Sequence, residues 1–252
     1  FSGASGNYTV SQKSLTGSIA SGTSVYGAAL APGTASITSG IVGSDQVSPG
    51  TVTVNTAGNT STSGNLKAGT YTGIQSVGST LSGADATNYT FAGTTGNYTV
   101  TPLTLAGVLG AGSSVYGASL VPGTVTFSNK VGSDIVTAAT PTINTTGNTS
   151  TSGNLKAGTY TGIQSVGSTL SGADAANYTF AGATGNYTVS PLALVGAIGA
   201  GSSVYGASLA PGSVTFSNKV TNDQVSGTVS VNTAEMLNGY PVIDTSSQTA
   251  SS

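Results

Sequence analysis

The chain of 252 residues contains no cysteine, histidine, tryptophan or arginine, and it has only five lysines and seven acidic residues. Without histidine and cysteine there is no Ser-His-Asp triad, no thiolate nucleophile and no zinc site of nitrogen and sulfur ligands. Without arginine there is no bidentate clamp for a phosphate or carboxylate. These absences exclude most enzyme chemistry, and we predict a protein that is not an enzyme, with no catalytic, cofactor-binding or metal-binding residue.

Charge and long apolar runs are equally scarce. The net charge is −2, and the five lysines are scattered, whereas affinity for nucleic acid requires clustered basic residues. No run of about 18 apolar residues occurs, so we predict no membrane span. Because cysteine is absent, no disulfide can hold the fold together, and each domain must bury a core of its own.

The residues that are abundant are small. Glycine, serine and threonine occur 38, 38 and 41 times and fill 117 of the 252 positions. Valine, isoleucine, leucine, tyrosine and phenylalanine nevertheless return at regular places, which distinguishes the chain from a disordered low-complexity segment. The composition therefore predicts folded β-structure.

An internal repeat is the strongest signal in the sequence. The motif Asn-Tyr-Thr-Val recurs in steps of 90 and 89 residues, at 7–10, 97–100 and 186–189. The tyrosine of Val-Tyr-Gly follows the same steps, as Tyr26, Tyr116 and Tyr205. A period near 90 residues is too long for one coil of a solenoid and suits a domain with its own core.

Short alternating runs within each copy indicate strands. Residues 124–127, 142–144 and 177–180 place apolar side chains on one face and hydroxyl groups on the other. Turn residues separate these runs every 8 to 15 positions, and residues 171–177 are expected to form at most one helical turn. The predicted fold class is all-β, with tandem immunoglobulin-like antiparallel β-sandwich modules of about 90 residues.

The motifs also carry a family resemblance. Each of the two whole copies has Val-Tyr-Gly, then a Gly-Ser-Asp turn, then Leu-Ser-Gly-Ala-Asp, and closes on Asn-Tyr-Thr-Val. This order resembles the YDG/MBG-type repeats of very large secreted bacterial proteins, which are similar to filamentous-haemagglutinin-like exoproteins and surface adhesins. The resemblance implies an extracellular array of the bacterial type, at the cell surface or in a biofilm matrix, with a structural or adhesive role and no catalytic residue.

The repeat predicts four segments. Residues 11–100 and 101–189 are two whole modules, and residues 190–252 are an incomplete or divergent third. Residues 1–10 match the end of each whole module, so we interpret them as the orphan terminal strand of a preceding or partner module.

Residues 1–10 thus correspond to part of the closing segment that the third module is predicted to lack. An incomplete sandwich exposes apolar core and unpaired backbone groups, which a strand from another molecule would cover. Such a contact joins the head of one chain to the tail of the next and generates a filament unless a ring closes. The residues assigned to this self-assembly hypothesis are Phe1, Asn7, Tyr8, Thr9, Val10, Met236, Leu237, Tyr240, Val242 and Ile243. In the other interpretation, the chain is an arbitrary span of a longer array.

Other polar residues have simpler interpretations. Each whole copy contains two aspartates, Asp45 with Asp85 and Asp134 with Asp174. They could form an acid–base pair of a glycosidase, but their glycine-rich contexts favour turns in which aspartate accepts backbone N–H bonds. Calcium is also disfavoured, because no Asp-x-Asp-x-Asp run occurs.

The lysines and tyrosines also have simpler interpretations. Lys67, Lys130, Lys156 and Lys219 could form isopeptide cross-links, but solvated lysines that discourage strand pairing are the better interpretation. Tyr98, Tyr116, Tyr160 and Tyr178 could form a platform for sugars. Burial of the ring with the hydroxyl bonded to the backbone is preferred for most of them.

The sequence therefore predicts an extracellular structural protein, a subunit of a surface fibre or matrix filament whose main partner is itself. The alternative is a repeat-array stalk of an adhesin that binds glycans or other surfaces.

Overall fold

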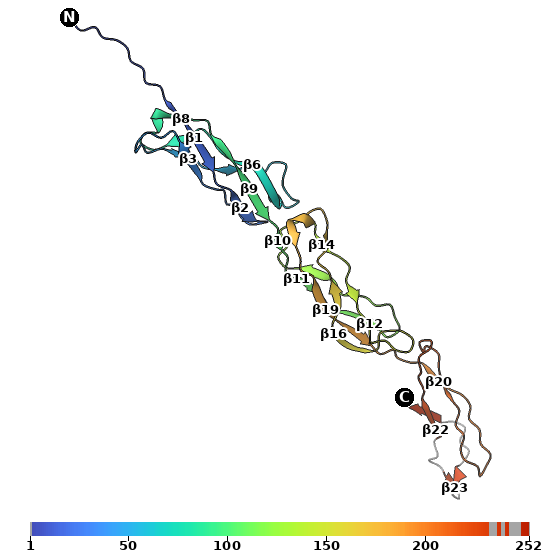
Figure 1. Cartoon of the computed structure of the whole chain (residues 1–252). Helices are drawn as coiled ribbons and strands as arrows, with labels where there is room; N and C mark the ends of the chain where they lie inside the picture. The colour runs from blue at the N-terminus through green and yellow to red at the C-terminus, as the bar shows by residue number, and fades with distance from the viewer. Residues whose placement is uncertain (1, 232–235, 238–239, 242–247, 252) are drawn as a thin grey trace. The chain divides into compact units, whose positions relative to one another are not determined.

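The computed structural model describes residues 2–231, 236–237, 240–241 and 248–251. This part of the chain is almost entirely β-structure (Figure 1). Its helical turns are two short 3-10 turns, η1 (Ala86–Asn88) and η2 (Ala175–Asn177). The all-β prediction is confirmed, and η2 lies within residues 171–177, where at most one helical turn is expected.

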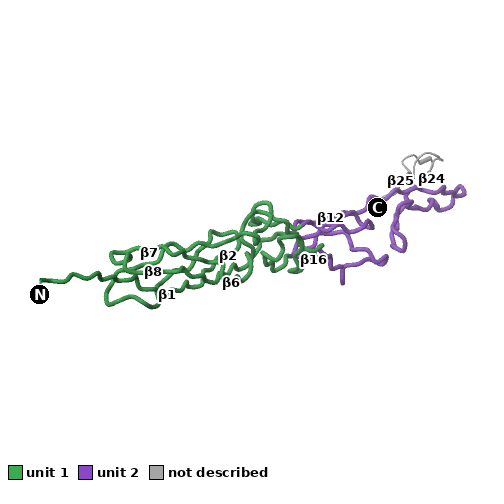
Figure 2. Tube along the Cα trace, turned by 90° about the horizontal axis from the view of Figure 1, so that it is seen from above, with its two compact units in different colours: residues 1–108, 125–140, 166–183 green, residues 109–124, 141–165, 184–252 purple. Residues whose placement is uncertain are grey.

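Two compact units make up the chain (Figure 2). Unit 1 comprises residues 1–108, 125–140 and 166–183, and unit 2 comprises residues 109–124, 141–165 and 184–252. The segment 101–189 therefore contributes residues to both units.

Unit 1 contains most of the strands. In chain order they are β1 (Lys13–Ile19), β2 (Gly22–Val25), β3 (Ala35–Ser39), β4 (Ser48–Pro49), β5 (Thr53–Val54), β6 (Gly69–Val77), β7 (Leu81–Ser82), β8 (Tyr89–Phe91), β9 (Thr94–Thr101), β10 (Leu103–Thr104), β11 (Gly107–Leu109, of which Leu109 belongs to unit 2), β13 (Val125–Phe127), β14 (Thr137–Ala138), β17 (Leu170–Ser171) and β18 (Tyr178–Thr179). Pairs of short strands, β4 with β7, β10 with β18, β11 with β13 and β14 with β17, form small separate sheets.

A four-stranded sheet in the order β2-β9-β6-β5 contains the closing strand of the first repeat. Its strand β9 lies between β2 and β6, where Gly96, Tyr98 and Val100 alternate with more exposed residues. This alternation puts one face of the strand into the core. Tyr98 is completely buried, and its hydroxyl accepts the Ala31 N–H at 2.8 Å.

A second sheet has the order β3-β1-β8, and an apolar cluster includes residues of β1, β8 and β6. The core contains Leu15, Ile19, Val77, Tyr89 and Phe91. Strand β1 contacts β9, and a Cβ on Gly96 would lie only 2.8 Å from Cβ of Ile19. The glycine therefore allows the two sheets to approach closely at this point.

The expectation of purely antiparallel sheets is wrong. Parallel strand pairs occur among the described residues: β1 with β8, β2 with β9, β10 with β18 and β12 (Gly112–Val115) with β19 (Ala183–Ser190). Parallel neighbours require a long crossover, which the roughly 70 residues between the members of each pair supply. Alternation of apolar and polar residues reports which face of a strand is buried but not the direction of its neighbour, so the pattern left this feature open.

Unit 2 repeats the four-stranded sheet, in the order β12-β19-β16-β15. Its strands are β12, β19, β15 (Thr142–Ile143), β16 (Gly158–Val166), β20 (Gly196–Ile198), β21 (Val214–Phe216), β22 (Thr228–Val231), β23 (Met236–Leu237), β24 (Tyr240–Pro241) and β25 (Gln248–Ser251); Val166 and Ala183 belong to unit 1. Leu155, Tyr187 and Val189 form the buried core of this unit.

The described part of the third copy of the repeat lacks one strand that the first two copies have. Its β20 and β21 pair with each other, but residues 201–204 form no strand, although they correspond to β2 and β12. The side chain of Val204 is 80% exposed, compared with 45% for Val25 and 46% for Val115. This difference has a simple basis, since β2 and β12 each pair with an Asn-Tyr-Thr-Val strand.

One buried glutamine in each four-stranded sheet connects several backbone groups. The Gln75 side chain is fully buried, accepts the Gly33 N–H at 2.6 Å, and donates to the carbonyl groups of Ala20 and Asn97 at 3.2 and 2.5 Å. Gln164 repeats the arrangement in unit 2 with Gly123, Gly110 and Asn186. A Cβ on Gly33 would lie 1.7 Å from the Ala20 carbonyl oxygen, so only glycine fits there.

Replacing Gln75 by methionine is expected to destabilise unit 1 by about 2 kcal/mol or more. Methionine keeps the volume but leaves one buried N–H and two carbonyl groups unpaired, each at a cost of about 1–3 kcal/mol. Hydrogen exchange of unit 1 peptides measures the loss. The matched control is Gln46→Met, an exposed glutamine whose side chain bonds only to the nearby Ser44 carbonyl; equal effects of the two changes would contradict the prediction.

Candidate functional site: the junctions between repeats

A buried carboxylate connects the first repeat to the second within unit 1. We define the Asp134 junction as Tyr26, Ser61, Ser63, Asp134 and Tyr178. Tyr26 directly follows β2, the two serines lie in the loop between β5 and β6, Asp134 lies in the turn before β14, and Tyr178 begins β18. The junction thus joins residues that are up to 108 positions apart in the sequence.

Donors surround the Asp134 carboxylate. Its Oδ2 accepts hydrogen bonds from the hydroxyls of Tyr26 and Tyr178, the latter at 2.7 Å. Its Oδ1 accepts from the Ser63 N–H at 3.0 Å and from the Ser63 hydroxyl. The Tyr26 hydroxyl also lies 2.6 Å from Ser61 Oγ. With only 1% of its surface exposed, Asp134 is a fully buried charge whose oxygens are both paired.

This environment changes the pKa values of the junction. Burial alone would raise the pKa of Asp134, but the hydrogen bonds from Ser63, Tyr178 and Tyr26 outweigh it and hold the pKa below its ordinary value. Burial and the hydrogen bond to Asp134 raise the pKa of Tyr26 and of Tyr178. The stable form of the junction is therefore an ionised aspartate with two neutral tyrosines.

A second set of polar contacts surrounds the carboxylate. Asp174 accepts the N–H of Ile135 at 2.9 Å and the N–H of Thr62 at 3.1 Å. Asn177 Oδ1 accepts the Ala68 N–H at 2.9 Å. The contacts to Thr62 and Ala68 again join the loop of the first repeat to the second repeat. Because each of these bonds is directional, the junction fixes one relative register of the two segments.

Apolar side chains enclose these polar groups. The rings of Tyr26 and Tyr178 meet edge to face with their centroids 5.2 Å apart. A continuous buried cluster of the same unit contains both rings, with members from both repeats: Tyr26, Leu66, Tyr98, Val100, Leu105, Val136, Val166, Tyr178 and Phe180. The first repeat and this part of the second repeat therefore share one core.

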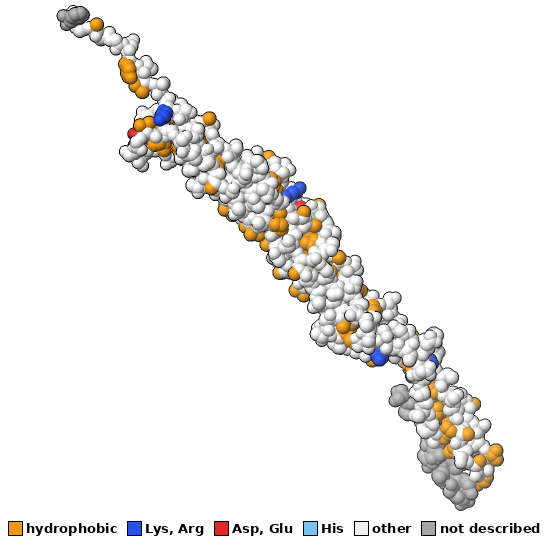
Figure 3. Space-filling model, viewed as in Figure 1, with side chains coloured by type: hydrophobic (Ala, Val, Ile, Leu, Met, Phe, Trp, Pro, Cys, Tyr) orange, Lys and Arg blue, Asp and Glu red, His pale blue; other side chains and the backbone are white. Residues whose placement is uncertain are grey.

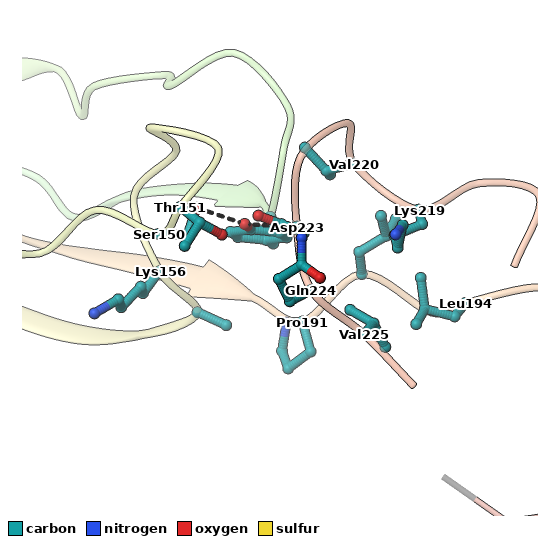
Figure 4. Close-up of a pocket in the computed structure, with 13 residues that line it drawn as sticks. Ser150, Thr151, Lys156, Pro191, Leu194, Lys219, Val220, Asp223, Gln224 and Val225 are labelled. Atoms are coloured by element: carbon teal, nitrogen blue, oxygen red, sulfur yellow. Dashed lines mark hydrogen bonds between the residues drawn. The ribbon is translucent and has the colours of Figure 1, made fainter. Parts of the chain in front are cut away.

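Unit 2 contains a second junction, which consists of residues that correspond to those of the first junction and lie one repeat later in the sequence. We define the Asp223 junction as Tyr116, Ser150, Ser152 and Asp223. The Tyr116 hydroxyl donates to Asp223 Oδ2 and lies 2.7 and 3.2 Å from the hydroxyl oxygens of Ser150 and Ser152. A pocket opens beside Asp223, and Figure 4 shows its walls.

Residues 7–10, assigned to self-assembly, have no strand partner. Residues 2–10 form no secondary structure, and Tyr8 and Val10 are 91% and 81% exposed. The same sequence motif is buried elsewhere, with Tyr98 at 0% and Val100 at 2%. Apolar side chains are visible on this extended segment near the N-terminus (Figure 3).

The other assigned residues lie in unit 2 or outside the described residues. Met236 and Leu237 form β23, which pairs antiparallel with β24, and Tyr240 is opposite Leu237. Phe1, Val242 and Ile243 lie outside the described residues.

The aspartates lie in turns, as predicted, but the backbone N–H groups that Asp85, Asp134 and Asp174 accept belong to distant segments. Asp85 accepts the N–H of Gln46, 39 residues away, and Asp174 accepts that of Thr62, 112 residues away. In the first repeat, Asp45 instead accepts the hydroxyl of Tyr89 at 2.6 Å. These aspartates therefore connect segments that are far apart in the sequence, a role that the turn interpretation did not predict.

The lysines and tyrosines behave largely as predicted. Lys67, Lys130, Lys156 and Lys219 are all exposed, and the Lys130 Nζ donates to the Asp134 carbonyl at 2.6 Å. Tyr98 and Tyr178 are buried with their hydroxyls accepting backbone N–H groups, and the Tyr160 hydroxyl donates to the Lys156 carbonyl. The Tyr116 hydroxyl differs, since its partners are side chains.

The Asp134 junction was not predicted from the sequence. A signal was present, because every copy pairs a Val-Tyr-Gly motif with an aspartate about 18–19 residues farther along. However, Tyr26 does not bond to Asp45 of its own repeat; it bonds to Asp134 of the next one. A periodic sequence cannot distinguish these two choices, because each repeat contains both partners.

No family model, curated protein or solved structure matches the chain. No cluster of three or more acidic, histidine or cysteine side chains that could hold a metal ion occurs among the residues described. The same part of the chain contains no apolar helix long enough to cross a membrane.

Replacing Tyr26 by phenylalanine should destabilise the Asp134 junction by about 1.5–3 kcal/mol, because a hydrogen bond to a buried charge is lost. Hydrogen exchange at Thr62, Ser63 and Ala68 should accelerate accordingly. Tyr8→Phe is the control, since Tyr8 is almost fully exposed and should leave exchange unchanged. Equal rates in the two variants would contradict the role of the Tyr26 hydroxyl.

The Asp134 junction should also weaken in acid. Because its folded pKa lies below the unfolded value of 3.8, ionised Asp134 adds stability that is fully present above that value and is lost as the pH falls through the folded pKa. We expect the stability difference between the native chain and Asp134→Asn to shrink progressively below about pH 4. Urea unfolding of both proteins at several pH values between about 7 and 2 measures this difference in stability. Hydrogen exchange then shows whether the loss lies in unit 1. A constant difference would refute the assignment.

Proposed function

We propose that this protein is an extracellular structural protein, a tandem array of immunoglobulin-like β-sandwich modules of about 90 residues that serves as a subunit of a surface fibre or matrix filament. The observation that carries the proposal is the recurrence of one junction. Tyr26 bonds to Asp134 in unit 1, and Tyr116 bonds to Asp223 in unit 2, so the same tyrosine of successive repeats contacts the aspartate of the following repeat.

The buried contacts support a mechanical role. Flexible arrays need no buried polar contacts between modules, whereas the Asp134 junction buries a charge and shares one apolar core between two repeats. Such an interface is costly to open, because an unpaired buried carboxylate would result. The extracellular assignment is supported by the resemblance of the motif order to secreted bacterial repeat proteins.

The modular interpretation draws on the sheets of unit 1. The interpretation is supported by the apolar cluster that joins Leu15 and Phe91 of the sheet β3-β1-β8 to Val77 of the sheet β2-β9-β6-β5. Two sheets with one core are the defining arrangement of a β-sandwich. The four-stranded sheet recurs in unit 2 one repeat later as β12-β19-β16-β15.

We further propose that chains assemble head to tail by strand complementation. Residues 5–10 carry the sequence of a central strand but have no partner in the described structure, and residues 201–204 correspond to an edge that normally receives this strand. Burying Tyr8 and Val10 as Tyr98 and Val100 are buried would contribute about 1.5–3 kcal/mol for each side chain. The contact is heterologous and therefore propagates from chain to chain.

The register of the contact follows from the pairs already present. Gly22 lies opposite Tyr98 in β2 and β9, and Gly112 lies opposite Tyr187 in β12 and β19. The same register places Gly201 of one chain opposite Tyr8 of the next, with parallel strands. By the rule of the two junctions, it also brings Tyr205 of the first chain to Asp45 of the second.

The substitution Val10→Asp should abolish filament formation, because it places a charge where the counterparts Val100 and Val189 are 2% exposed. Sedimentation velocity and electron microscopy of the 252-residue chain measure the assembly. The expected result for the native chain is a concentration-dependent series of oligomers.

Ser5→Asp is the matched control, since its counterpart Thr95 is exposed on the other face of β9. This variant should assemble as the native chain does. Strand complementation would be rejected by native chains that stay monomeric at high concentration, or by filaments that tolerate Val10→Asp.

A further inference from the structure

The pocket at the Asp223 junction contains a buried carboxylate of which one oxygen has no hydrogen-bond partner. Its volume is about 500 Å³, within the range of ligand sites, and its walls come from three segments of unit 2 (Figure 4). Asp223 is 8% exposed, and its Oδ1 has no hydrogen-bond partner. Ser152, the counterpart of Ser63, is engaged instead by Ser150 and Asn154. A buried carboxylate oxygen without a donor marks a place where a donor is missing.

The equivalent space in unit 1 is filled. Around Asp134 it is occupied by residues 170–180, which comprise β17, η2 and β18 with the sequence Leu-Ser-Gly-Ala-Asp-Ala-Ala-Asn-Tyr-Thr-Phe. Tyr178 of this segment donates to Asp134 and accepts the Val131 N–H at 3.0 Å. Its neighbour Thr179 accepts the Leu105 N–H at 2.8 Å through its carbonyl oxygen.

The residues that line the empty pocket are the counterparts of those that hold this segment. The groups that bind residues 170–180 in unit 1 belong to Tyr26, Thr62, Ala68, Leu103, Leu105, Val131, Asp134 and Ile135. One repeat later, the pocket is lined by Tyr116, Thr151, Ala157, Leu192, Leu194, Val220, Asp223 and Gln224. Each position of the holding surface is therefore repeated, while the segment that it holds is not among the described residues of unit 2.

We propose that the pocket beside Asp223 binds a Leu-Ser-Gly-Ala-Asp-x-x-Asn-Tyr-Thr-Phe segment of another repeat of this type. The tyrosine hydroxyl of the segment donates to the Asp223 carboxylate and accepts the Val220 N–H. The aspartate accepts the N–H groups of Thr151 and Gln224, and the asparagine accepts that of Ala157. The apolar ends of the segment cover Leu192 and Leu194, as Tyr178 covers Leu103 in unit 1.

The chemistry of the pocket selects a phenol. Asp223 Oδ2 accepts the Tyr116 hydroxyl but lacks the second hydroxyl donor that Tyr178 provides to Asp134 Oδ2, and the apolar walls favour an aromatic ring. None of the N–H groups of Thr151, Ala157, Val220 and Gln224 donates to a side chain within the described part of the chain. A segment with an acceptor at each of these positions is bound at several points at once, which distinguishes it from an arbitrary aromatic peptide.

This inference rests on the proposed repeat architecture but not on filament formation. The segment differs from residues 5–10, which are proposed to pair with residues 201–204. In the second repeat the two corresponding elements are likewise distinct, as β18 and β19. Binding of the segment can therefore be tested separately from self-assembly.

The probe is a synthetic capped peptide with the sequence of residues 170–180, added to the 252-residue chain carrying Val10→Asp so that assembly does not interfere. Isothermal titration calorimetry should give saturable binding of one peptide per chain. Amide NMR shifts should change at Val220 and Gln224. A peptide with phenylalanine in place of its tyrosine should bind at least about tenfold more weakly, because a hydrogen bond to a charged group is lost.

Two chain variants complete the test. Asp223→Asn should reduce the affinity for the tyrosine peptide to that of the phenylalanine peptide, and Asp45→Asn, in the corresponding turn of the first repeat, should leave it unchanged. If Asp223→Asn unfolds the third repeat, the comparison of the two peptides on the chain with intact Asp223 still tests whether the pocket recognises the tyrosine hydroxyl. Absence of binding, equal affinity of the two peptides, or shifts located away from the pocket would overturn the proposal. Binding without filaments in the parent chain would reject only strand complementation, and filaments without binding would reject only the pocket.

Discussion

The burial of one carboxylate determines how the repeats of this chain join. Asp134 can remain ionised inside unit 1 only because Ser63, Tyr26 and Tyr178 supply donors to both of its oxygens. Tyr26 and Ser63 come from the first repeat, and Tyr178 comes from the second. Neither repeat can satisfy the charge alone, so separating them would leave a buried anion with too few partners. The contact is thus cooperative between repeats.

A polar contact of this kind also determines specificity. An apolar interface tolerates small changes in register, because the hydrophobic effect has no direction. Hydrogen bonds to Asp134, Asp174 and Asn177 have defined angles and distances, and they come from neighbouring positions of one loop. Shifting this loop by one residue would lose several of them together. For an array of nearly identical repeats, in which wrong pairings are chemically similar to right ones, such selectivity prevents slippage.

Part of this structure could be predicted from the sequence. Alternation at Thr124–Phe127 and Tyr178–Phe180 identified strands, and a turn before Tyr178 was expected where η2 forms. The direction of β9 relative to β2 could not be predicted, because alternation is the same for parallel and antiparallel neighbours. The partner of Tyr26 could not be predicted either. Its own repeat offers Asp45 and the next offers Asp134, and only the three-dimensional path of the chain decides between them.

Segments of identical sequence have different surroundings in this chain, so the repeat alone does not determine which side chains are buried. Asn88 is exposed, whereas Asn177, in the same motif one repeat later, is 2% exposed because it accepts the Ala68 N–H of the preceding repeat. Tyr8 and Tyr98 differ in the same way, since only the second lies between two neighbouring strands. The local sequence determines which groups a segment offers, and the adjacent repeat determines whether those groups are paired. The same motif is therefore paired in one copy and exposed in another, according to which segments lie beside it.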